Sequence, residues 1–149
     1  GGEVEYCWVW GEYATVTGNL LPLLFASPPP TPVLNVNISY AKLETCNGIW
    51  WVAFQLENRS GVSFKSISIV VRDAQTSTVA TMELNGFTNK DGCGTTRTEE
   101  TLVAGGTVTV SSSAFGYNPS GNNLGAKIKL CTSLDRTGAC VERELSFKP

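Results

Sequence analysis

Apolar and polar residues alternate along seven separate segments of this chain of 149 residues, and this period of two limits the fold more than any other feature. Such alternation is typical of β-strands that bury one face. No stretch keeps a helical period for more than two turns. We therefore expect an all-β fold, a seven-stranded β-sandwich. Its strands are predicted at residues 33–44, 49–58, 62–72, 78–84, 107–113, 124–132 and 140–147.

Two places in this pattern are irregular. Val62 and Phe64 are out of phase with the later apolar residues of their segment, which predicts a β-bulge near Lys65 and Ser66. Residues 85–98 are polar, and we expect them to form a long loop.

The last two segments predict their own register. If Cys131 and Cys140 lie opposite each other in a hairpin, the charged residues of its outer face fall into two opposed pairs, Lys129 with Glu142 and Lys127 with Glu144. Opposite charges at opposed positions stabilise a sheet. Because one register satisfies the cysteines and both charge pairs, we predict a Cys131–Cys140 disulfide.

The five cysteines of the chain indicate two disulfides and one remaining thiol. Cys46 would then pair with Cys93, which ties the first predicted turn to the long loop. Two disulfides are typical of an oxidising compartment and predict an extracellular or cell-surface location. Cys7 is either a buried, reduced cysteine or the site of an intermolecular disulfide.

A proline-rich spacer at residues 27–32 separates an N-terminal arm, residues 1–26, from the body, residues 33–149. The arm alternates at its start and contains a Gly-Glu turn, so we expect a β-hairpin or extended arm. It has large apolar side chains that need a partner surface. Candidate assembly residues are Val4, Tyr6, Trp8, Val9, Trp10, Leu20, Leu21, Leu23, Leu24 and Phe25. The arm docks either on its own body or on a neighbouring subunit.

Several function classes are excluded by composition. The chain has no histidine, which removes Ser-His-Asp and Cys-His catalysis and histidine metal sites. A formal net charge of -2 provides no basic field for nucleic acid. The longest apolar stretch, residues 20–26, is much shorter than a membrane span of about 20 residues. We expect a protein that is not an enzyme, with no cofactor, metal site or transmembrane segment.

Three residues are candidates for contact with carbohydrate. Asn37 and Asn58 each begin an Asn-X-Ser sequon and are possible glycosylation sites. Trp51 is expected to point outward, because its neighbour Trp50 is in phase with the inward-facing residues. An exposed indole could stack on a sugar ring, or it could pack between domains.

Residues 50–61, WWVAFQLENRSG, resemble the second strand and turn of an immunoglobulin-like module. Residues 130–132 and 138–142 resemble the closing hairpin of such modules in bacterial secreted and surface proteins of the Chloroflexota type. The resemblance covers residues 33–149 and none of the arm. It implies an immunoglobulin-like β-sandwich at the cell surface without catalytic activity. The predicted disulfides depart from the antibody pattern, in which a disulfide joins the two sheets beside a tryptophan.

These observations together favour a structural protein. The sequence predicts a subunit of a pilus-like extracellular filament or surface assembly, whose arm docks on the next copy, by strand donation or by covering an apolar patch. Its expected partners are copies of itself. The alternative is a carbohydrate-binding or adhesive surface module that uses exposed aromatic residues.

Overall fold

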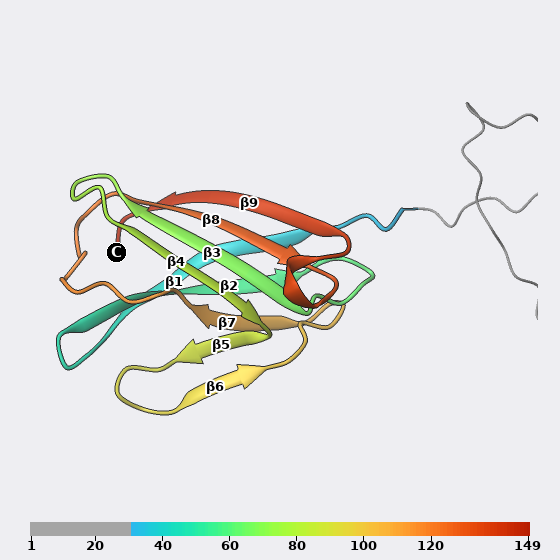
Figure 1. Ribbon diagram of the computed structural model, residues 1–149, viewed down its shortest axis with the longest axis horizontal. Coiled ribbons are helices and arrows are strands. Elements are labelled where there is room, and N and C mark those ends of the chain that lie inside the picture. Colours follow the sequence, from blue (N-terminus) through green and yellow to red (C-terminus); the bar gives the residue numbers. More distant parts are fainter. Residues whose placement is uncertain (1–30) are drawn as a thin grey trace, which may run out of the picture. The chain divides into compact units, whose positions relative to one another are not determined.

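The computed structural model describes residues 31–149. The chain divides into two units, Gly1–Pro30 and Thr31–Pro149, and the described residues form the second. Everything predicted for the arm at residues 1–26 and for Cys7 therefore lies outside the described residues. Residues 31–149 are all-β, with a short 3-10 turn at Leu134–Arg136 (Figure 1).

The strands of residues 31–149 pair antiparallel in three sheets. The first has the order β1-β2-β7, with β1 at Val36–Cys46, β2 at Ile49–Asn58 and β7 at Thr107–Ser111. The second has the order β4-β3-β8-β9, with β4 at Val79–Asn85, β3 at Ser66–Asp73, β8 at Leu124–Cys131 and β9 at Cys140–Phe147. The third is a hairpin of β5 at Phe87–Lys90 and β6 at Thr96–Glu99, and β5 lies beside β7 (Figure 1).

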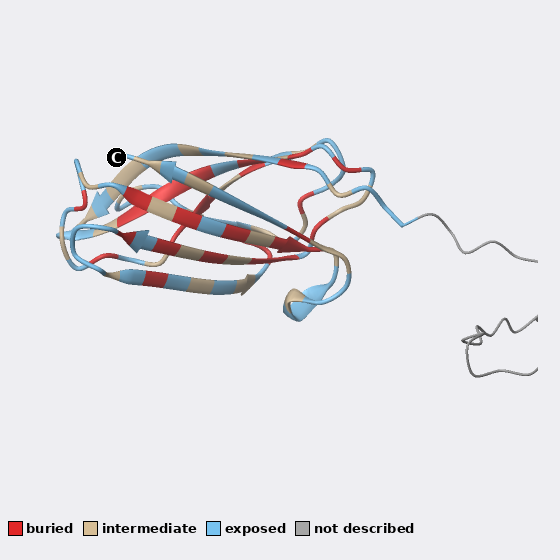
Figure 2. Ribbon diagram, turned by 90° about the horizontal axis from the view of Figure 1, so that it is seen from above, coloured by how far each residue is buried: buried red, intermediate tan, exposed pale blue. Residues whose placement is uncertain are grey.

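The two larger sheets share one apolar core. Val52 and Phe54 of β2 belong to the same buried cluster as Ile69 of β3 and Ile128 of β8. Buried residues alternate with less buried ones along most of β3 and β8 (Figure 2), as the period of two in the sequence requires. In β2 the residues from Trp51 to Phe54 are all buried. Each of the seven predicted segments overlaps one of the strands of the two larger sheets, with ends that differ by up to four residues.

The prediction of a long loop at residues 85–98 is wrong, because this segment forms the β5–β6 hairpin. Most of its side chains are polar and remain in solvent, so its sequence lacks an apolar alternation. Phe87 anchors the hairpin in the core with 1% of its surface exposed. The hydroxyls of Thr88 and Thr98 form a cross-strand hydrogen bond of 3.0 Å.

The predicted bulge near Lys65 and Ser66 is also absent from the described strands. β3 begins at Ser66 and keeps a regular register with both of its neighbours. Phe64 precedes the strand and is fully buried, and it forms an isolated bridge with Leu102. The change of phase in the sequence therefore marks the start of the strand. A register shift occurs instead in β1, between Tyr40 and Lys42.

The predicted register of the closing hairpin is confirmed. Cys131 lies opposite Cys140, and the two charge pairs and their apolar neighbours are opposed as expected. The Cys131–Cys140 and Cys46–Cys93 disulfides are both formed. The ion pairs do not follow the register strictly. The Lys127 ammonium lies 3.7 Å from its opposed residue, Glu144, and closer, at 2.7 Å, to the diagonal residue Glu142.

Candidate functional site

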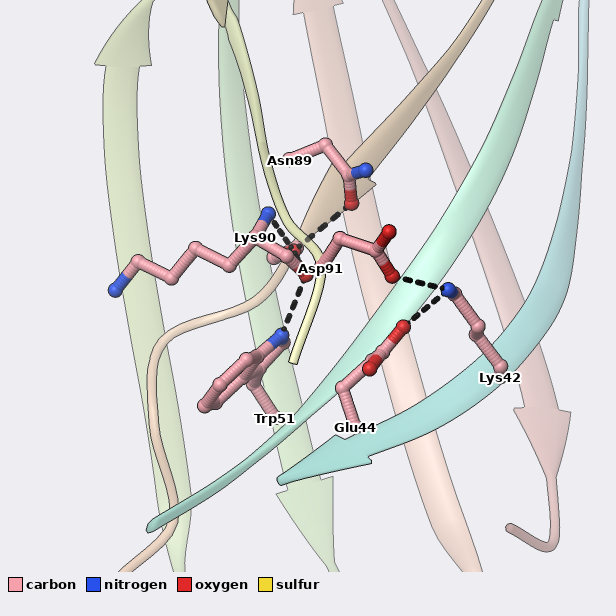
Figure 3. A network of polar contacts seen from close by, with 7 residues as sticks. Lys42, Glu44, Trp51, Asn89, Lys90 and Asp91 are labelled. Atoms are coloured by element: carbon pink, nitrogen blue, oxygen red, sulfur yellow. Dashed lines mark hydrogen bonds and ion pairs between the residues drawn. The ribbon is translucent and has the colours of Figure 1, made fainter. Parts of the chain in front are cut away.

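Trp51 is covered by the β5–β6 hairpin and is 5% exposed. Its indole Nε1 donates a hydrogen bond of 3.0 Å to the carbonyl oxygen of Lys90 (Figure 3). The Lys90 ammonium lies 5.9 Å from the centre of the ring. The expectation that Trp51 points into solvent and stacks on sugars is therefore wrong, because the hairpin covers the outer face of β2 at this point.

A small charged network lies beside Trp51 and joins β1 to the same hairpin (Figure 3). The Lys42 ammonium is 2.8 Å from Asp91 Oδ1 and also contacts the Glu44 carboxylate. The hydrogen bond to Asp91, and to a smaller extent the one to Glu44, raises the pKa of Lys42 above its ordinary value. The bond to Lys42 lowers the pKa of Asp91. The single ammonium of Lys42 thus bridges two carboxylates, and the network ties β1 to the hairpin.

The Cys46–Cys93 disulfide also attaches the hairpin to the first sheet near Trp51. It joins the end of β1 to the turn that follows β5. The Ser111 hydroxyl of β7 accepts a hydrogen bond of 2.8 Å from the Lys90 amide. The hairpin is thus attached to all three strands of the first sheet, by the disulfide and Lys42 on β1, Trp51 on β2 and Ser111 on β7.

Asp73 is a buried carboxylate with a structural role. It lies at the end of β3 and is 1% exposed. Its Oδ2 accepts hydrogen bonds from Tyr117 at 2.7 Å and Asn122 at 2.6 Å, and its Oδ1 accepts from the amides of Gln75 and Thr76. Burial alone would raise the pKa of Asp73, but these hydrogen bonds outweigh it and lower the pKa to about 2. The carboxylate fixes the β3–β4 turn to the loop before β8.

The outer face of the β4-β3-β8-β9 sheet contains a hollow. Gly125 in β8 lies between the core residues Leu124 and Ala126, so its face is the solvent side. Arg72 of β3 and Ser146 of β9 are its directly opposed neighbours. Two adjoining depressions of about 750 and 390 Å³ are both lined by Gly125 and these two neighbours. We call the pair of depressions the Gly125 hollow.

The rim of the Gly125 hollow has apolar and cationic groups. Val79 of β4 lines it and is 46% exposed. Arg72 and Lys148 also line it, and among residues 31–149 neither of them forms an ion pair. Lys127 and Glu144 both line the second depression, and their charged groups lie 3.7 Å apart. An apolar ligand with a negative charge fits such a surface.

The Gly125 hollow is not among the sites that the sequence predicts. The available signal was a glycine inside a strand segment, at a position where neither a turn nor a bulge is indicated. The depression itself depends on the neighbours of Gly125 in β3 and β9, which the sequence of one strand does not reveal.

The two sequons differ sharply in the fold. Asn37 is exposed on β1, and its amide contacts Glu57 Oε2 at 3.4 Å. Asn58 is fully buried, and its amide nitrogen donates to the carbonyl oxygens of Val62, Leu102 and Val103. A glycan at Asn58 is incompatible with these bonds, so that part of the prediction is wrong, and Asn37 stays a prediction.

No protein-family model and no curated protein matches the sequence. The structure is similar to the crystal structure of a Bordetella pertussis protein with the provisional name ApaA, with 13% identity and a TM-score of 0.41 over 81% of this chain and 97% of that chain. It is also similar to the X-ray structure of a Northeast Structural Genomics Consortium target, with 8% identity and a TM-score of 0.38 over 79% of this chain and 86% of that chain.

The part of the chain that the structure describes contains no helix long and apolar enough to cross a membrane. The same residues contain no group of three His, Cys, Asp or Glu side chains that could hold a metal ion.

Proposed function

We propose that this chain is an exported, non-catalytic immunoglobulin-like module that assembles with copies of itself. In this proposal the body is the structural subunit of an extracellular filament or surface assembly. The N-terminal arm, residues 1–26, docks on the body of a neighbouring copy.

The strand order supports the immunoglobulin-like assignment. In an immunoglobulin sandwich, one sheet contains strands A, B and E, and the other contains C, F and G, with C′ beside C in variable-type domains. The orders β1-β2-β7 and β4-β3-β8-β9 follow this scheme when the strands are taken in sequence. The β5–β6 hairpin then occupies the position of strand D beside β7. The disulfides differ from the antibody type, since Cys131–Cys140 joins neighbouring strands of one sheet.

The assembly proposal rests on one observation: the seven strands that residues 31–149 place in the two larger sheets already fill the immunoglobulin scheme. The sandwich therefore needs no strand from the arm to complete it. The arm nevertheless contains three aromatic residues with a spacing of two, at Tyr6, Trp8 and Trp10. Large aromatic side chains are costly to leave in water and are typical anchors of interfaces. A neighbouring copy supplies a surface for them.

The cysteines support export. Both disulfides lie in the body and use four of the five cysteines. Disulfides persist in oxidising compartments and are rare in the cytosol. Cys7 is left without an intrachain partner, so a covalent bond from it would have to reach another molecule.

The test compares the intact chain with a chain lacking residues 1–26, by negative-stain imaging and sedimentation, with and without reductant. Filaments or oligomers of the intact chain, and monomers of the shortened chain, are the expected result. A full-length Trp8→Ala/Trp10→Ala variant should lose assembly in the same way, and urea unfolding checks that every body is folded. Monomers of the intact chain at all concentrations would contradict the proposal. Binding of that monomer to a glycan array would then favour the adhesive alternative.

A further inference from the structure

We propose that the Gly125 hollow is the surface on which the N-terminal arm of a second copy docks. An aromatic side chain of the arm lies over Gly125, and glutamates of the arm pair with Arg72 and Lys148. This inference rests on the proposed function and adds to it the site of contact.

Gly125 itself is the first argument. Glycine in a strand interior weakens the strand, and it often marks a bulge or the close approach of another molecule. The register of β8 with β3 and β9 is continuous, so Gly125 lies in no bulge. A Cβ atom at this position would meet no atom within 4 Å. The fold of the body therefore does not require a glycine here. An aromatic ring that docks flat on this face needs the space that a Cβ atom would fill.

The shape and lining of the hollow are the second argument. Its larger depression, of about 750 Å³, is bounded on the solvent face by Val79 of β4 as well as by Gly125. A large aromatic side chain in a pocket of this kind is a typical anchor of a protein interface. The Arg72 guanidinium at the rim can stack on the face of such a ring.

The charges of the hollow and of the arm are opposite, which favours the arm as the segment that binds there. Residues 1–26 contain Glu3, Glu5 and Glu12 and no lysine or arginine. The hollow presents Arg72 and Lys148, which form no ion pair within residues 31–149. An acidic, aromatic segment and an apolar hollow with cations at its rim are complementary, and such complementarity guides association.

The edges of the same sheet are poorer docking sites. On the edge strand β4, the Thr81 carbonyl oxygen already accepts a hydrogen bond of 2.6 Å from the Ser113 hydroxyl. The other edge strand, β9, presents Glu142, Arg143 and Glu144 in succession. Charged residues on an edge strand oppose strand addition. The face of the sheet is therefore favoured over its edges.

The decisive variant is Gly125→Val in the full-length chain. A valine side chain fills the hollow from a strand position that accepts it, so we expect the body to fold and the concentration needed for assembly to rise about tenfold or more. Gly61→Val is the matched control, since its Cβ atom also meets open space and it does not line the hollow. It should assemble as the wild type does.

A charge exchange tests the same contact without filling the hollow. Arg72→Glu should weaken assembly, and combining it with Glu3→Lys and Glu5→Lys in one chain should restore it. If the wild-type chain assembles and neither Gly125→Val nor Arg72→Glu changes that assembly, the docking site is wrong and the proposed function stands. If the wild-type chain stays monomeric, both proposals fail.

Discussion

The indole nitrogen of Trp51 and the carbonyl oxygen of Lys90 are joined by a hydrogen bond of 3.0 Å between residues 39 positions apart in the sequence. This bond lies beneath the β5–β6 hairpin, beside the Lys42–Asp91 ion pair and the Cys46–Cys93 disulfide. It makes Trp51 a part of the body's packing. Sugar recognition by this ring would require the hairpin to detach first.

Trp51→Phe should therefore lower stability. The smaller ring loses the hydrogen bond to Lys90 and part of its packing, and we expect the free energy of unfolding to fall by about 1–2 kcal/mol. Urea unfolding measures the change. Trp50→Phe is the control, because Trp50 is only half-buried and should change stability less. An unfolding curve unaltered by Trp51→Phe would contradict this role.

The contrast between the closing hairpin and Trp51 shows what the sequence predicts well. The β8–β9 register was predictable because cysteines and charges only 9 to 17 residues apart agree on it. The position of Trp51 was not, because its cover is held by contacts across 47 and 49 residues, the Cys46–Cys93 bond and the Lys42–Asp91 pair. The pairing of Cys46 with Cys93 follows from the sequence by elimination, but the β5–β6 hairpin that this disulfide anchors does not. The Gly125 hollow could not be predicted for the same reason, because it is formed together with residues of β3 and β9 that lie far from Gly125 in the sequence or on another strand.

The two disulfides should stabilise the body unequally. Cys46–Cys93 spans 47 residues and Cys131–Cys140 spans 9. Loop-closure entropy alone gives about 4 kcal/mol for the first bond and about 2.5 kcal/mol for the second. Urea unfolding of Cys46→Ala/Cys93→Ala and of Cys131→Ala/Cys140→Ala checks this order. A larger loss in the second variant would show that local packing at the hairpin outweighs chain entropy.

Asp73 should make the body sensitive to acid. Its pKa is about 2 in the folded chain against an ordinary value of 3.8, so the unfolded chain takes up a proton first as the pH falls. The stabilisation is fully present above about pH 4 and is lost between about pH 4 and pH 2. It corresponds to about 2 kcal/mol. Urea unfolding at a series of pH values measures this loss.

Asp73→Asn provides the control for that measurement. The amide cannot titrate, and it keeps one oxygen to accept the bonds that fix the turn. The variant should be less stable than the wild type at pH 7, and the difference between the two should shrink as the pH falls to 2. A constant difference across this range would mean that Asp73 does not supply the acid sensitivity.

Two glycines should respond to alanine in opposite directions. At Gly125, alanine meets open space on an extended strand, and it should raise the free energy of unfolding by about 0.5–1 kcal/mol, because it restricts the unfolded chain. At Gly138 the backbone φ is +77°, and a Cβ atom would lie 2.7 Å from the hydroxyl oxygens of Thr132 and Ser133. Gly138→Ala should therefore lower stability by more than about 1 kcal/mol. Urea unfolding of both variants tests this, and destabilisation by Gly125→Ala would mean that the fold itself requires the glycine. A chain that is more stable but assembles less well is the pattern expected if Gly125 serves an interface.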